Sequence, residues 1–340
     1  MAQTELGPGD LLDARGRLAK AGWARNEARR YSRAAVAASP LRIKEWDYYC
    51  VLAGDHGLAA VVADNGYMGL LSVVWFDFRA PSFTTESVIT PFPMGRMRMP
   101  QSADAGDIVQ EHPRLKLAFR HTPGGRRLTL DCPGFGKGQG LSGELRLAQP
   151  PMDRMTIATP WRGAPKAFYY NQKINCMAAE GMVTVGGKAH AFTPDRAFAV
   201  LDWGRGVWTY RNTWYWGSAS GLADGVPFGF NIGYGFGDTS AASENMVFHD
   251  GVAHKLDQVT FHLPAGGYDS GPWRFTSNDG RLEMTFEPIL DRPDLTDLKI
   301  LRSDTHQVFG HFKGVAVLDD GRKVAFDRLL GFAEKVQNAW

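Results

Sequence analysis

Residues 57–78 read GLAAVVADNGYMGLLSVVWFDF, two apolar runs separated by the turn sequence Asp64-Asn65-Gly66. Each run has the length of a strand and is rich in β-branched and aromatic residues. Asn-Gly between such runs is a strong signal for a tight hairpin turn. The stretch therefore predicts a β-hairpin whose two strands are largely buried.

The same pattern of short apolar runs and turns extends from Trp46 towards the C-terminus. Short apolar or alternating runs are separated by turn signals at short intervals. Four further turns of this kind are Pro123-Gly124-Gly125, His249-Asp250-Gly251, Asn278-Asp279-Gly280 and Asp319-Asp320-Gly321. Hairpin connections favour antiparallel sheets over alternating strands and helices. We therefore expect an all-β protein with little helix, folded as antiparallel β-barrels or barrel-like sandwiches packed together, with a barrel mouth as the natural ligand site.

The length of 340 residues suits two β domains. We expect an N-terminal arm over 1–40, partly helical within 11–38, although Gly16 and Gly22 interrupt that helix. The irregular, Pro-rich segment 149–165 suggests a division near residue 165. The predicted domains are then a first barrel over 41–165 and a second over 166–340, which carries the candidate site.

Charge and cysteine content limit the kinds of binding partner and the cellular compartment that we expect. Lys and Arg number 38 against 36 Asp and Glu, a formal net charge of +2, so no chain-wide field attracts nucleic acid. The three cysteines are far apart, which argues against a disulfide framework and fits a reducing compartment. The N-terminal segment MAQTELGPGDLLDARG has no apolar core of a signal peptide, and no apolar run approaches the roughly 18 residues of an integral membrane segment. We expect a cytoplasmic protein and leave its oligomeric state open.

Motifs for cofactors and metals are weak. The glycine spacing in 138–143, GQGLSG, matches a dinucleotide fingerprint, but an alternating strand pattern follows it and predicts a hairpin loop instead. The histidine pairs His249/His254 and His306/His311 lack the spacing of a helical zinc pair. No nucleophile elbow occurs. The sequence predicts no cofactor and no metal.

The most site-like stretch is 202–221, DWGRGVWTYRNTWYWGSASG, which holds four of the ten tryptophans within fourteen residues. If 208–220 runs as one strand, the alternation of side chains puts both aromatic and polar groups on one face. That face would comprise Trp208, Tyr210, Asn212, Trp214, Trp216, Ser218 and Ser220. Such a mixture suits a small-molecule cavity. The structural alternative is that the tryptophans fill a barrel core and that Asp202 and Arg205 form a buried ion pair.

Several segments resemble the bacterial family called domain of unknown function 2804, from about Gly22 to Trp340. They are 202–221, KINCM at 173–177, GFNIGYG at 229–235, SEN at 243–245, FGHF at 309–312 and GFAE at 331–334. By a more distant likeness that family is similar to proteins with two lipocalin-like (calycin) barrels, including carotenoid hydratases, tocopherol cyclases and fungal cyclisation enzymes. The resemblance implies a pair of lipocalin-like barrels and an apolar or amphipathic small-molecule ligand.

The first hypothesis for function is a cofactor-free lyase or isomerase, with hydratase-like or cyclase-like chemistry in a Trp-lined cavity. Asp202 would be the general acid, unless the nearby Arg205 keeps it ionised and makes it a base or an orienting anion. Glu244 and Lys173 are the further candidates for proton transfer. The candidate ligand-binding residues are Tyr210, Trp214, Trp216, Asn231, Trp208 and Asn175.

Two other hypotheses remain open at the level of sequence. The same aromatic residues could serve a lipid or pigment carrier that performs no chemistry. Tryptophan platforms beside carboxylates also occur in carbohydrate-processing enzymes, which need two carboxyl groups at a defined separation.

Overall fold

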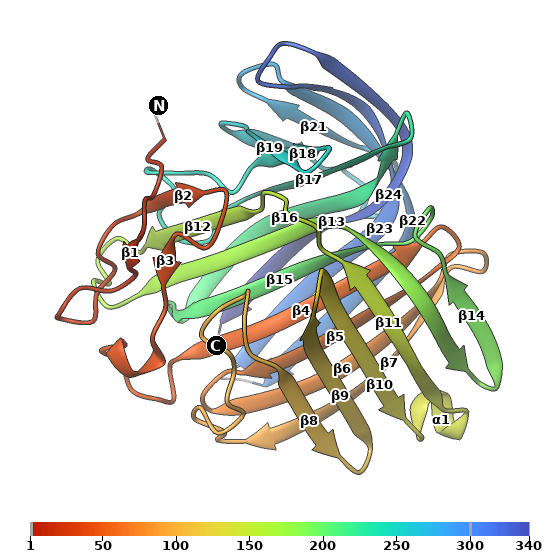
Figure 1. Cartoon of the computed structure of the whole chain (residues 1–340), viewed down its shortest axis with the longest axis horizontal. Coiled ribbons are helices and arrows are strands. Elements are labelled where there is room, and N and C mark those ends of the chain that lie inside the picture. Colours follow the sequence, from red (N-terminus) through yellow and green to blue (C-terminus); the bar gives the residue numbers. More distant parts are fainter. Residues whose placement is uncertain (1–2, 299–300, 340) are drawn as a thin grey trace.

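The computed structural model describes residues 3–298 and 301–339. The chain is nearly all β, with one nearly closed barrel and one half-barrel sheet, which confirms the predicted fold class. Figure 1 shows most of the first sheet in the lower part of the view, with strands coloured from orange through yellow to green, and the second sheet above and behind it, in blue-green to blue. The predicted hairpin is formed by strands β5 (His56–Asp64) and β6 (Met68–Asp77).

The first sheet has 13 strands, and its main path runs in the order β7-β6-β5-β4-β15-β13-β11-β10-β9-β8. Neighbours on this path pair antiparallel. The remaining strands of this path are β4 (Lys44–Ala53), β7 (Ser82–Pro91), β8 (Ile108–His112), β9 (Leu115–Thr122), β10 (Gly125–Cys132), β11 (Leu141–Ala148), β13 (Phe168–Val185) and β15 (Phe198–Val207). The strands β12 (Met155–Pro160) and β14 (Lys188–Phe192) pair with β13 at the side of this path, and the short helix α1 (Phe135–Gly138) follows β10.

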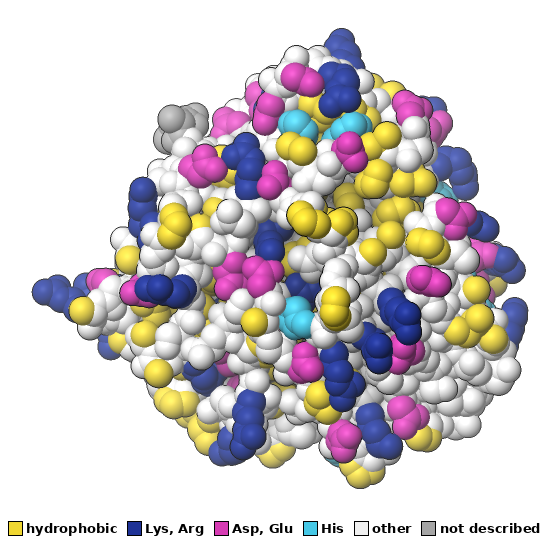
Figure 2. Space-filling view, in the orientation of Figure 1, with side chains coloured by type: hydrophobic (Ala, Val, Ile, Leu, Met, Phe, Trp, Pro, Cys, Tyr) yellow, Lys and Arg dark blue, Asp and Glu magenta, His cyan; other side chains and the backbone are white. Residues whose placement is uncertain are grey.

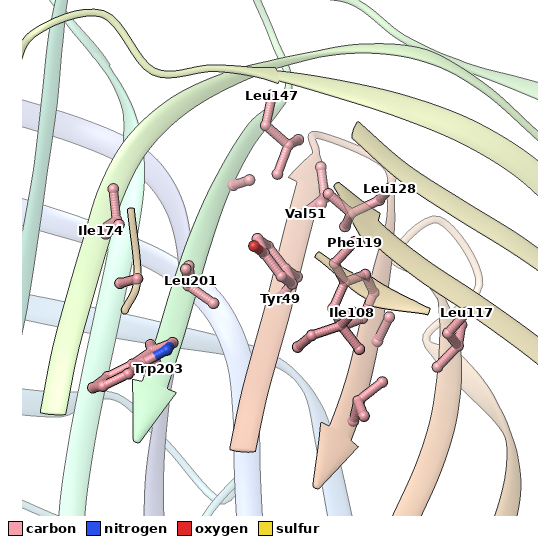
Figure 3. Close-up of a cluster of buried hydrophobic side chains, with 14 of the residues drawn as sticks. Tyr49, Val51, Ile108, Leu117, Phe119, Leu128, Leu147, Ile174, Leu201 and Trp203 are labelled. Carbon is pink, nitrogen blue, oxygen red and sulfur yellow. The ribbon is translucent and has the colours of Figure 1, made fainter. Parts of the chain in front are cut away.

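The interior of the first sheet is filled with side chains. The sheet curls so that β8 to β11 face β4 to β6, and Tyr49, Val51, Phe119 and Leu128 meet between them (Figure 3). Leu201 and Trp203 of β15 continue the same buried cluster. This barrel therefore has a packed core of its own.

The second sheet has nine strands in the order β19-β18-β17-β16-β24-β23-β22-β21-β20. They are β16 (Arg211–Ala223), β17 (Val226–Tyr234), β18 (Met246–His249), β19 (Val252–Lys255), β20 (Val259–His262), β21 (Trp273–Ser277), β22 (Leu282–Leu298), β23 (Leu301–Val317) and β24 (Lys323–Ala339). Its own core is rich in phenylalanine, including Phe230, Phe275, Phe286 and Phe312. The chain passes from the first sheet to the second between Val207 and Arg211, later than the division expected near residue 165.

The N-terminal arm differs from the expectation of a partial helix. It contains β1 (Gly9–Asp10), β2 (Gly22–Ala24), β3 (Arg29–Arg30) and a single 3-10 turn at Arg33–Ala35. The expected helix over 11–38 is wrong. Pairing of β2 with β12 holds Gly22 at a φ of 156°, and a Cβ there would lie 2.4 Å from the carbonyl oxygen of Thr4. Glycine is needed for this close approach, so strand pairing overrides the Ala and Arg content.

The surface carries charges of both signs. On the face shown in Figure 2, basic and acidic side chains are interspersed, in keeping with the formal net charge of +2. In the part of the chain that the structure describes, no helix has the length and apolar character needed to cross a bilayer.

Candidate functional site

A pocket of about 220 Å³ lies where the two sheets face each other. Its wall combines side chains from β4, β5, β13 and β15 of the first sheet with others from β16, β24 and the segments that flank β16 and β17. Most of the lining is apolar or aromatic, and the pocket is partly open to solvent. The lining residues are Trp46, Val61, Ala63, Asn65, Tyr169, Lys173, Asp202, Trp208, Trp214, Trp216, Phe236, Glu244 and Glu334. The pocket is thus shared between the sheets and does not lie in the mouth of one barrel.

Strand alternation explains why the first sheet can supply both a core and a pocket wall. In β15, Asp202 lies on the pocket side, whereas Trp203 and Arg205 point into the barrel. In β13, Tyr169 and Lys173 face the pocket, and the intervening Tyr170 joins the barrel core. Successive side chains of a strand point to opposite faces, so each of these strands serves two environments.

Lys173 and Asp202 form an ion pair in the pocket wall. The two residues are direct register partners on β13 and β15, and Lys173 Nζ lies 2.8 Å from Asp202 Oδ1. The same oxygen accepts a hydrogen bond from the Asn171 amide at 2.6 Å, and Oδ2 accepts one from the indole of Trp46 at 3.0 Å. Both oxygens of the Asp202 carboxyl group are thus engaged, one by a cation and an amide and the other by an indole.

Glu334 is the buried carboxyl group on the opposite wall. Trp214 Nε1 donates to its Oε1 at 2.9 Å, and Gln307 Nε2 donates to its Oε2 at 3.2 Å. Burial raises the pKa of Glu334 to about 7, and the negative charge of Asp202 adds to this, against the lowering effects of the Trp214 hydrogen bond and of Lys173. A group with such a pKa exchanges protons near neutral pH.

Glu244 is the third carboxyl group in the lining. It lies in the segment between β17 and β18, where a Cβ on Gly233 would approach its carboxyl carbon to 3.0 Å. Burial raises the pKa of Glu244, and Asp202 raises it further, whereas Lys173 and a hydrogen bond from Asn231 lower it. The site thus combines the Asp202–Lys173 ion pair with two buried carboxyl groups whose pKa is raised.

Five of the aromatic rings in the lining form one connected array. Phe236 packs edge-to-face on Tyr169, Trp208 and Trp214, with ring centroids 4.7, 5.3 and 5.1 Å apart. Trp46 stacks on Tyr169 at 6.0 Å and meets Trp208 edge-on at 5.2 Å. Each ring is held by its neighbours, so the rings are positioned in advance of any ligand.

Six of the residues expected at the site line this pocket: Asp202, Lys173, Glu244, Trp208, Trp214 and Trp216. Asn231 and Asn175 lie behind it. Asn231 accepts a hydrogen bond from the Trp216 indole at 2.7 Å and donates to the Glu244 carbonyl at 2.8 Å, so it positions two lining residues. Asn175 donates to Ser218 Oγ at 2.8 Å and to the Phe230 carbonyl at 3.1 Å, which ties β13 to the second sheet.

Arg205 and Tyr210 do not line the pocket. Arg205 is fully buried inside the first barrel, where it pairs with Asp47 at 2.9 Å and lies over the ring of Trp203 at 4.0 Å. The expected proximity of Arg205 to Asp202 is therefore wrong, because residues three apart in a strand point to opposite faces. Tyr210 is 51% exposed in the connection between β15 and β16. The alternation assumed over 208–220 holds only from Arg211, where β16 begins.

Sequence reasoning missed Trp46, Tyr169, Phe236 and Glu334 among others. Glu334 belongs to the segment GFAE at 331–334, which was noted only for its family resemblance. Its signal was a carboxylate after an apolar run in a strand-like segment. Trp46 marked the start of the β-rich region but carried no site signal, since its role depends on its register opposite Gly204.

Solved structures with the same architecture support the fold. The crystal structure of CghA with Sch210972 superposes with a TM-score of 0.56 at 11% identity, covering 98% of this chain and 97% of CghA. The crystal structure of a putative AttH from Nitrosomonas europaea superposes with a TM-score of 0.53 at 15% identity, covering 88% of this chain and 93% of AttH. The crystal structure of kievitone hydratase from Nectria haematococca superposes with a TM-score of 0.51 at 9% identity, covering 99% of this chain and 98% of the hydratase.

At these identities the likeness concerns the fold alone. No curated protein matches the chain significantly. The family model described as domain of unknown function (DUF2804) matches residues 2–340, and the chain belongs to that family.

Proposed function

We propose that the pocket between the sheets binds an apolar or amphipathic small molecule and catalyses a cofactor-free lyase or isomerase reaction on it by proton transfer. The observation that carries this proposal is Glu334, a buried carboxyl group in an aromatic pocket whose pKa is raised to about 7. Such a group is protonated in part of the molecules at neutral pH and can act as a general acid. This assigns to Glu334 the role that the sequence suggested for Asp202.

The aromatic wall suits the charge that such a reaction develops. Protonation of a ligand double bond by Glu334 would leave a cation on the ligand and a carboxylate on the protein. The rings of Trp214, Trp216 and Tyr169 would stabilise that cation by about 1–2 kcal/mol each when desolvated. Loss of a proton from a neighbouring carbon, or addition of water with loss of its proton, would return Glu334 to its acid form and complete an isomerisation or a hydration.

Asp202 has a different part in this proposal. Its contacts with Lys173, Asn171 and Trp46 hold it in place, so it acts as an orienting partner for the ammonium of Lys173. The pair places a permanent dipole in the pocket wall. A polar group of an amphipathic ligand would be oriented by that dipole, while the apolar body contacts the rings.

The test compares wild-type protein with Glu334→Gln, using an apolar extract of cells of the protein's own host as the probe. Wild type should change the concentration of at least one extract component, as followed by liquid chromatography and mass spectrometry. Glu334→Gln should retain that component unchanged, as seen by native mass spectrometry. The control is Glu283→Gln, which removes a carboxylate at an exposed position of the same sheet.

A carrier would behave differently. Wild type and Glu334→Gln would then hold the same unmodified compound, and neither would alter the extract. That result would reject the catalytic part of the proposal and keep the binding part.

A further inference from the structure

The charges in the pocket wall do not balance. Among the described residues that line the pocket, Lys173 is the one basic side chain, and it faces three carboxyl groups, those of Asp202, Glu244 and Glu334. The ammonium of Lys173 is engaged by Asp202 at 2.8 Å. Glu244 and Glu334 are thus left without a basic partner in the lining.

The protein meets this imbalance by favouring the protonated acids. Burial and the charge of Asp202 raise the pKa of both Glu244 and Glu334, and Lys173 offsets this only in part. Lys255, which is outside the lining, also lowers the pKa of Glu244, as the smallest of the effects on it. A positive charge brought into the pocket would reverse the effect, because an opposite charge nearby favours the ionised carboxylate.

The aromatic lining points to the same kind of guest. Six rings surround the cavity, those of Trp46, Tyr169, Trp208, Trp214, Trp216 and Phe236. Aromatic rings beside carboxylates are the usual surroundings of organic cations, which are attracted to the ring faces. An anionic head group, by contrast, would meet two carboxyl groups and a lysine that is already paired.

One cation already occupies an aromatic face in this pocket. Lys173 Nζ lies 3.7 Å from the ring centroid of Trp216. This contact shows that the wall can hold an ammonium group on a ring while a carboxylate neutralises it. Lys44 Nζ likewise lies 5.3 Å from the ring centroid of Trp208.

We propose that the ligand of this pocket carries a cationic nitrogen, an amine or a quaternary ammonium, on its apolar body, and that this nitrogen pairs with Glu244 among the aromatic rings. The inference rests on the proposed function in using the same pocket, and it names the class of ligand. Glu244 is the counter-ion because both oxygens of Glu334 already accept hydrogen bonds, from Trp214 and Gln307.

The test uses three soluble probes of nearly the same shape. Choline carries a trimethylammonium group, 3,3-dimethylbutan-1-ol replaces that nitrogen with carbon, and 3,3-dimethylbutanoate carries a negative charge. Each is titrated into wild type, Glu244→Gln, Glu334→Gln and the surface control Glu283→Gln, with binding followed by tryptophan fluorescence. We expect choline to bind wild type and Glu283→Gln at least tenfold more tightly than the alcohol, and Glu244→Gln to lose this preference.

Two further measurements make the result independent of any one variant. Glu334→Gln should keep the preference for choline, even though it loses turnover in the extract assay. In wild type, choline affinity should rise with pH as the Glu244 carboxyl group, whose pKa burial raises, loses its proton, whereas affinity for the alcohol should stay constant. The rise should persist in Glu334→Gln, because the other charged groups that act on Glu244, those of Lys173, Asp202 and Lys255, are unchanged there.

Equal affinity for choline and the alcohol would overturn the cation inference and leave binding of an apolar ligand intact. Tighter binding of 3,3-dimethylbutanoate would overturn it as well and would assign the head group to Lys173. If none of the probes binds at any concentration up to their solubility, both the inference and the use of this pocket for small molecules are rejected.

Discussion

The indole nitrogen of Trp214 on β16 donates a hydrogen bond to Glu334 on the neighbouring strand β24, at 2.9 Å from Oε1. This bond lowers the pKa of Glu334, but burial has the larger effect and raises the pKa to about 7. Because the bond favours the ionised carboxylate, its loss should favour the acid.

Trp214→Phe should therefore raise the pKa of Glu334 above 7, by about one unit if the bond contributes as hydrogen bonds to charged groups commonly do. The protonated carboxyl band can be followed by infrared difference spectroscopy, with Glu334→Gln as the blank. Trp273→Phe is a matched control, since Trp273 is buried in the second core and its indole donates to the Tyr268 carbonyl. An unchanged titration in Trp214→Phe would contradict the assigned hydrogen bond.

Glu334 should also make folding stability depend on pH. Its folded pKa is raised from 4.5 to about 7, so the native state binds more protons than the unfolded state between these values. The free energy of unfolding should then fall as pH rises from about 4.5 to 7, by ~3 kcal/mol from this residue.

The matching measurement is urea unfolding of wild type and Glu334→Gln at pH 5 and pH 8. Relative to wild type, the free energy of unfolding of the variant should be higher at pH 8 than at pH 5, because glutamine does not ionise. A difference between the two proteins that is the same at both pH values would show that the pKa of Glu334 is not raised.

Arg205 should matter for folding and not for ligand chemistry. It pairs with Asp47 inside the first barrel and also donates to the carbonyls of Trp46 and Pro100. Arg205→Met leaves Asp47 buried without its cation, which should cost about 3–5 kcal/mol in the free energy of unfolding.

The exposed Arg274, 3.8 Å from Glu283, provides the comparison, and Arg274→Met should cost no more than about 1 kcal/mol. Urea unfolding measures both. If Arg205→Met has normal stability but does not turn over the extract component, Arg205 has a role in catalysis.

Gly204 should prove essential for the shape of the pocket. A Cβ at this position would lie 2.0 Å from Cζ2 of Trp46, the ring that donates to Asp202. Gly204→Ala must therefore displace Trp46, and we expect a loss of about 1–3 kcal/mol in stability together with weaker binding of the choline probe. Gly134→Ala, where nothing lies within 4 Å of the added carbon, should leave both properties near those of wild type.

The sequence was informative where local rules decide the structure. The turn at Asp64-Asn65-Gly66 joins β5 to β6. In β16, Trp214 and Trp216 line the pocket, whereas Tyr215 between them packs against the second core, as alternation predicts. Pattern alone also predicted an all-β chain with little helix. These features depend on neighbours within a few residues.

The rest depends on contacts that are remote in sequence. Trp214 and Glu334 are 120 residues apart, and Trp46 is 156 residues from Asp202. The register that brings them together is set by the pairing of whole strands, which no local pattern reveals. The N-terminal arm shows the same limit, since pairing with β12 decides its conformation.

The residues that line the pocket are separate from those that form the core of each sheet. None of the residues that line it belongs to the buried cluster inside the first sheet or to the phenylalanine-rich cluster of the second. Substitutions in the pocket wall can therefore alter the shape and charge of the cavity without emptying either core. The lining rings belong instead to the clusters packed between the two sheets, so such substitutions act on the cavity and on the contact between the sheets.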